Sequence, residues 1–180
     1  MKEIITRKDV LNEAYALGAV LGIIPVCCQL INYAVAGAGA FIVTLVSFVL
    51  WAAKFGGCIY LMRWWMVRLC STYDEVTNKD TRRLGVLAAL FSALIIAAWT
   101  FADTCFIHSE LYQQSIDSVF SQYSSMLDSN STSMLQNVRG SMGYIGFFSN
   151  FIYCFLFGYV LSVILSSRIP SRNPFADVQD

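Results

Sequence analysis

The sequence predicts an all-α, polytopic membrane protein with four transmembrane helices in an up-down bundle. Of its 180 residues, 57% are hydrophobic and 13% are charged, whereas about a quarter of the residues in a soluble domain are charged. It also contains four apolar runs of 22 to 25 residues, and about 20 apolar residues in a helix cross a bilayer core. The runs are continuously apolar, whereas barrel strands alternate apolar and polar residues. The predicted spans are Ala14–Val35, Ala38–Met62, Leu84–Ile107 and Gly143–Leu165.

The basic residues predict the orientation of these spans. Only Arg139 lies on the predicted outward side, and Lys54 lies inside the second span. The other ten lie on the opposite side: Lys2, Arg7, Lys8, Arg63, Arg68, Lys79, Arg82, Arg83, Arg168 and Arg172. Because cytoplasmic loops collect Lys and Arg, both termini are expected in the cytoplasm. No basic stripe is interleaved with aromatic residues, so the expected environment is the lipid bilayer and not a nucleic acid.

The first two spans are predicted to form a hairpin, because only a short apolar turn at residues 36–39 joins them. Gly18 and Gly22 form a small-xxx-small pair in the first span, which allows another helix to approach closely. That neighbour could belong to the same bundle or to a second copy of the chain in a homo-oligomer.

The predicted outward segment, Ser109–Ser141, is the one sizeable element outside the spans. Its apolar residues recur at three- and four-residue steps, which predicts an amphipathic helix from about Glu110 to Leu127. A polar turn at residues 128–133 and one more short helix over 134–138 are expected to follow. The candidate partner face of the long helix comprises Ile116, Phe120 and Tyr123. This face has to be buried against the ends of the spans, the bilayer surface or another membrane protein.

Ionisable residues inside a span are costly and often mark function. Asp103 lies near the outer end of the third span, with polar residues at similar depth in the other spans. We predict a polar intramembrane site of Asp103, Gln29, Asn32, Thr100, Asn150 and Tyr153, with Lys54 as a deeper candidate. The cluster could be a ligand vestibule, a proton site or a hydrogen-bonded knot that fixes helix packing. Lys54 lies roughly 15 Å from Asp103 along the bundle axis, too far for a direct ion pair.

Catalytic and metal-binding patterns are weak. The single histidine, His108, has Asp103 and Ser109 nearby in sequence, but a Ser-His-Asp triad needs the histidine between its two partners. Ser109 follows His108 directly and is expected to point elsewhere. The six cysteines form neither a C-x-x-C pair nor a Cys/His metal spacing. We therefore expect no enzymatic activity, metal or cofactor.

Three segments resemble a known family: residues 72–75 (TYDE), 108–117 (HSELYQQSID) and 169–175 (IPSRNPF). Together with the length and the four spans, they resemble the bacterial membrane family called domain of unknown function 4199 (DUF4199). The resemblance implies a multi-pass protein of the bacterial inner membrane. It brings no activity or binding residues with it.

The sequence favours two functions over an intramembrane enzyme, for which no plausible base–nucleophile pair is found. The first is a non-enzymatic scaffold or accessory subunit of an envelope membrane complex, because the chain offers an outward apolar face and no catalytic constellation. The alternative is a transporter or binding protein for a small solute or a lipid-like ligand, acting as a homo-oligomer. Asp103 and Lys54 motivate that alternative.

Overall fold

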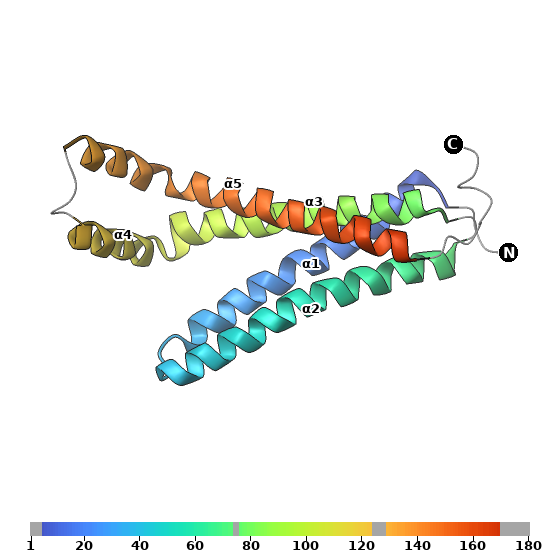
Figure 1. Cartoon of the computed structure of the whole chain (residues 1–180), viewed down its shortest axis with the longest axis horizontal. Coiled ribbons are helices and arrows are strands. Elements are labelled where there is room, and N and C mark those ends of the chain that lie inside the picture. Colours follow the sequence, from blue (N-terminus) through green and yellow to red (C-terminus); the bar gives the residue numbers. More distant parts are fainter. Residues whose placement is uncertain (1–4, 74–75, 124–128, 170–180) are drawn as a thin grey trace. The chain divides into compact units, whose positions relative to one another are not determined.

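The computed structural model describes residues 5–73, 76–123 and 129–169, without the side chains at 119, 120, 123 and 129–139. Every regular element in these ranges is helical (Figure 1). The elements are α1 (Arg7–Val35), α2 (Ala40–Thr72), α3 (Asn78–Ala102), the π-helical turn η1 (Asp103–Ile107), α4 (Ser109–Tyr123) and α5 (Ser129–Arg168). Four stretches are long and apolar enough to cross a membrane: Arg7–Val35, Ala40–Thr72, Asn78–Ile107 and Gly140–Arg168. The predicted all-α class with four membrane helices is confirmed, and the up-down order of the spans stays a prediction.

The chain divides into two compact units. The first unit contains residues 1–96 and 153–180, and the second contains residues 97–152. The long helices α3 and α5 each contribute one part to the first unit and one part to the second.

In the first unit, helix α1 begins with a capping box. The backbone N–H of Thr6 donates to the Asp9 carboxylate at 2.9 Å, and the backbone N–H of Asp9 donates to Thr6 Oγ1 at 3.4 Å. These contacts satisfy N–H groups that lack partners at a helix start. The helix then presents Leu17 to a core that also contains Met66 and Leu84. The side chains of all three residues are 0% exposed. The cap therefore sets where α1 begins, and the apolar stripe sets what it packs against.

The backbone of α1 lies directly against α3 at the two glycines. A Cβ atom added to Gly18 would lie 2.7 Å from Phe91 Cβ and 2.9 Å from the carbonyl oxygen of Ala88. A Cβ atom added to Gly22 would lie 2.9 Å from Ile95 Cβ. The small-xxx-small pair thus faces α3 of the same chain, so this face is not open to a second copy.

Hydrogen bonds connect α3 and α5 within the first unit. The Ser162 hydroxyl on α5 donates to the carbonyl oxygen of Arg82 on α3 at 3.0 Å. The Arg82 guanidinium in turn donates to the Tyr159 hydroxyl at 3.0 Å. Ser162 is 0% exposed, and because a buried hydroxyl needs a partner, its bond favours one register of the two helices.

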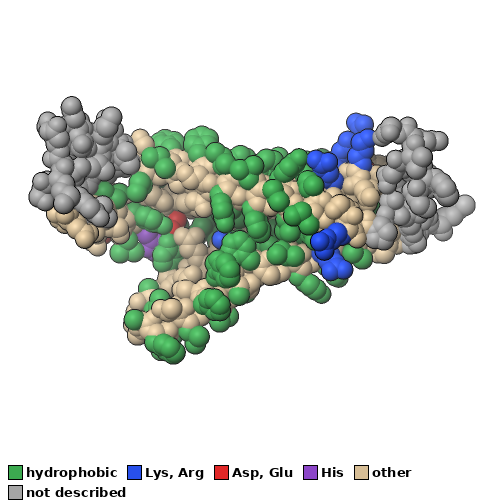
Figure 2. Space-filling model, viewed as in Figure 1, with side chains coloured by type: hydrophobic (Ala, Val, Ile, Leu, Met, Phe, Trp, Pro, Cys, Tyr) green, Lys and Arg blue, Asp and Glu red, His purple; other side chains and the backbone are tan. Residues whose placement is uncertain are grey.

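Basic side chains gather toward the end of the first unit where α2 ends and α3 begins, and hydrophobic side chains cover its length (Figure 2). At this end the indole N–H of Trp65 on α2 donates to the Glu13 carboxylate on α1 at 2.6 Å. The Arg68 guanidinium lies over the rings of Trp64 and Trp65, 5.4 and 5.8 Å from their centroids. Tryptophan and arginine at a span end are typical of a membrane–water interface.

Replacing Trp65 with Phe is expected to lower the stability of the α1–α2 pair. The change keeps an aromatic ring but removes the N–H that donates to Glu13, and a hydrogen bond to a charged group contributes about 1.5–3 kcal/mol. Thermal unfolding in detergent is the measurement. Trp64→Phe is the matched control because Trp64 is 43% exposed, and an equal effect of both changes would contradict the assignment.

The second unit contains the end of α3, η1, α4 and the first part of α5. Gly143 of α5 packs against Phe101 and Cys105, and the rings of Phe101 and Tyr144 lie 5.4 Å apart. Helix α5 runs unbroken from Ser129 to Arg168, so the predicted turn over 129–133 and the separate short helix over 134–138 are wrong. The polar residues that suggested a turn instead form the first turn of a 40-residue helix. The predicted end of the preceding helix, 124–127, and residue 128 lie outside the described residues.

Candidate functional site

The third membrane helix changes its geometry at Asp103. Helix α3 ends at Ala102, and η1 follows with π-helical hydrogen bonding. The backbone N–H of His108 donates to the carbonyl oxygen of Asp103 at 2.9 Å, which closes a five-residue turn. Single π-helical turns are rare and occur frequently at functional sites. The side chains that this turn positions are therefore candidates for a functional site.

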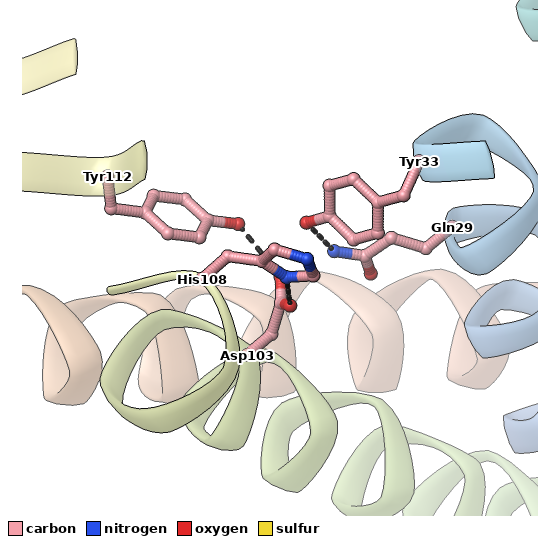
Figure 3. Close-up of polar contacts among 5 residues, drawn as sticks. All are labelled: Gln29, Tyr33, Asp103, His108 and Tyr112. Carbon is pink, nitrogen blue, oxygen red and sulfur yellow. Dashed lines mark hydrogen bonds and ion pairs between the residues drawn. The ribbon is translucent and has the colours of Figure 1, made fainter. Parts of the chain in front are cut away.

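The Asp103 carboxylate is 0% exposed and has a partner on each oxygen (Figure 3). His108 Nδ1 lies 2.6 Å from Asp103 Oδ1, and the Tyr112 hydroxyl donates to Asp103 Oδ2 at 3.1 Å. The His108 side chain is 27% exposed. An ionised carboxylate only accepts hydrogen bonds, so with Asp103 ionised the proton of this contact is on His108 Nδ1. We call these three residues the Asp103 cluster.

The Asp103 cluster joins the end of the third span to the first turn of α4. Asp103 lies in η1, His108 caps η1, and Tyr112 lies one turn into α4. Helix α4 has 15 residues, so it is about 22 Å long. The Tyr112 hydroxyl thus connects the first turn of α4 to the end of the third span.

A pocket of about 190 Å³ adjoins the Asp103 cluster within the second unit. Thr104, Ser109 and Gln113 contribute polar groups to it, and Tyr112 and Ile116 also line it. Ile116, the described member of the candidate partner face, is therefore half-buried and turned toward this pocket. The side chains of Phe120 and Tyr123 lie outside the described residues.

The other predicted residues of the second unit have partners nearby. The Asn150 side-chain amide donates to the carbonyl oxygen of Gly146 at 2.9 Å, within its own helix α5. Thr100 is half-buried, and a Cβ atom added to Gly146 would lie 3.4 Å from Thr100 Cγ2. Asp103, also predicted for the site, contacts His108 and Tyr112.

Gln29, Asn32, Tyr153 and Lys54 belong to the first unit. Gln29 donates to the Tyr33 hydroxyl at 3.0 Å on α1 (Figure 3), and Asn32 accepts a hydrogen bond at 3.1 Å from Ser47 on α2. Tyr153 is 60% exposed and lines a cavity together with Lys54. Gln29 and Asn32 thus make hydrogen bonds within the first unit, and Lys54 and Tyr153 line a cavity there.

Sequence reasoning missed His108 and Tyr112 as partners of Asp103 for a geometric reason. In an α-helix a step of five residues turns the side chain by about 140° from the first one. The π-helical turn, with its i→i+5 bond, brings His108 back over Asp103. The only signal in the sequence was an acid followed at five and nine residues by a histidine and a tyrosine.

Within the described ranges, no three His, Cys, Asp or Glu side chains gather as a metal site requires. The contacts described for the Asp103 cluster hold a buried acid in place. They allow the cluster to position a helix and to share a proton between a carboxylate and an imidazole.

The protein is helical, and its four long apolar helices are compatible with an integral, multi-pass membrane protein. The chain matches no family model, and comparisons with curated proteins and with solved structures find no match.

Proposed function

We propose that this protein is a non-enzymatic scaffold or accessory subunit of an envelope membrane complex, and that α4 is its docking element. The observation that carries the proposal is the Asp103 cluster, which holds α4 at a set angle to the third span. Most described side chains of α4 are exposed, including Leu111 at 53%. A helix fixed in this way presents the same surface at all times, which lowers the entropic cost of binding a partner.

The burial of a carboxylate supports this proposal. Removing a charge from water is expensive, and partners offset that cost only in good geometry. A helix that merely rests on lipid needs no fixed exit angle and gains nothing from such a cluster. A docking helix does gain, because its interface forms only in one orientation. We therefore assign the Asp103 cluster a positioning role.

The test is a triple variant, Ile116→Ser, Phe120→Ser and Tyr123→Ser. We expect it to lose a co-purifying membrane protein while the four spans still fold, because it removes apolar area from one face of α4. The measurement is quantitative mass spectrometry of the tagged protein extracted from its own membranes. Gln114→Ala with Ser118→Ala is the matched control on exposed positions of the same helix. Equal co-purification by the triple variant and the control contradicts the proposal.

We place the protein in the bacterial inner membrane and in the DUF4199 family, also as proposals. The support is the excess of basic residues on one side of the spans and the resemblance of the three segments described above.

The second candidate function is the binding or transport of a small-solute or lipid-like ligand. One observation favours it: Lys54 lines an apolar cavity in the first unit. This function includes a homo-oligomer, which would use a surface other than Gly18 and Gly22 because these face α3 of the same chain.

A further inference from the structure

The first unit contains a cavity of about 60 Å³ whose wall comes from α1, α2, α3 and α5. Its lining is almost wholly apolar and includes Leu21, Phe55, Met62, Ile96, Phe157 and Leu161. An engineered apolar cavity of about 150 Å³ is known to hold a benzene molecule. This smaller one has room for part of a single hydrocarbon chain, with the remainder of the chain lying in its opening.

Lys54 is the one ionisable amine in the lining of this cavity. It is half-buried, and its ammonium lies 5.9 Å from the centroid of the Phe55 ring. Among the described residues no carboxylate forms an ion pair with it. A charge inside a membrane helix is costly and is usually paired. A cation–π contact supplies only part of the stabilisation that an anion would give.

Two hydroxyl groups accompany Lys54. Ser92 on α3 is 9% exposed, Tyr153 on α5 is 60% exposed, and both line the same cavity. A carboxylate accepts several hydrogen bonds, so an ammonium and two hydroxyls match it chemically. The cavity therefore combines an apolar slot with donors for an anionic head.

We propose that this cavity binds a single-chain anionic amphiphile of the fatty-acid class, with its carboxylate on Lys54 and its alkyl chain along the apolar lining. The slot holds part of one chain, so the second chain of a phospholipid gains no contact with it, and a small polar anion leaves the apolar wall unused. A neutral amphiphile leaves Lys54 unpaired. The proposal gives the second candidate function a ligand class. It does not depend on α4 as a docking element, and its test involves no residue of α4.

The experiment uses the full chain in nanodiscs of zwitterionic phosphatidylcholine, with a spin-labelled stearate as the probe. Unlabelled palmitate and hexadecanol compete for the site at a pH of about 8, where a carboxylate is ionised. We expect palmitate to displace the probe at a concentration at least about tenfold lower than hexadecanol, because charge-assisted hydrogen bonds are about twice as strong as neutral ones. Equal competition by the two compounds overturns the proposal without any variant.

Variants test whether the preference for palmitate over hexadecanol depends on Lys54. Lys54→Met keeps a long apolar side chain without the charge, and we expect it to lose the palmitate preference. Lys54→Arg keeps the charge, and we expect it to retain the preference. Lys79→Met, on an exposed lysine outside the cavity lining, is the control and should behave as the wild type. Undiminished preference in Lys54→Met overturns the proposal, and so does native mass spectrometry that finds a retained two-chain phospholipid instead of a fatty acid.

Discussion

Replacing Asp103 with Ala is expected to release α4 from its fixed angle at the end of the third span. The change removes the two carboxylate oxygens that the Tyr112 hydroxyl and His108 Nδ1 contact, at a side chain that is 0% exposed. A hydrogen bond to a charged group contributes about 1.5–3 kcal/mol. Hydrogen–deuterium exchange at the junction of η1 and α4 should therefore accelerate about tenfold or more, since about 1.4 kcal/mol corresponds to one factor of ten.

The measurement is peptide-resolved exchange of the protein in nanodiscs. Peptides from α1 and α2 should be unchanged, because they belong to the other unit. Asp103→Asn keeps one acceptor oxygen and should give an intermediate rate. Glu110→Gln, at an exposed acid in the first turn of α4, is the control for the loss of a negative charge. Wild-type exchange in Asp103→Ala would show that the cluster does not hold α4.

Replacing Gly18 with Leu is expected to separate α1 from α3 and to destabilise the first unit. The first atom of the new side chain would lie 2.9 Å from the carbonyl oxygen of Ala88, which is backbone and cannot turn aside. Overpacking of a core typically costs about 1–3 kcal/mol, and a helix displaced along its whole contact costs more. An apparent melting temperature lower by at least about 2–4 °C should follow for a protein of this length.

The control for Gly18→Leu is Gly56→Leu. Gly56 is also a glycine inside a membrane helix, but an added Cβ there meets nothing within 4 Å. Thermal unfolding in one detergent compares the two variants directly. Equal melting temperatures for the two variants would contradict the close approach of α1 and α3.

The membrane helices could be predicted because their signal is local and strong. A continuous apolar run such as Ala38–Met62 is expected to be helical in lipid, because a helix satisfies all of its backbone hydrogen bonds internally. The residues at which the helices begin and end could not be predicted as accurately from the apolar runs. Helix α2 continues to Thr72, because Arg, Met and Leu residues beyond the apolar run are good helix formers.

The partners of Asp103 could not be predicted from periodicity, because they depend on a local change of helix type. The sequence gives depth along a span, and depth suggested Gln29, Asn32 and Asn150 as companions of Asp103. It does not indicate where an α-helix widens into a π-helical turn. Similarly, Gly18 and Gly22 indicated a close helix contact, but only the three-dimensional structure identifies α3 as the neighbour.

Native mass spectrometry of the tagged wild-type protein, extracted gently from its own membranes, tests the central proposal most directly. The accessory-subunit proposal predicts one stoichiometric second protein in the spectrum, lost in the triple Ser variant of α4 and retained in the Gln114→Ala, Ser118→Ala control. A bare monomer or homo-oligomer in the wild-type spectrum would contradict it.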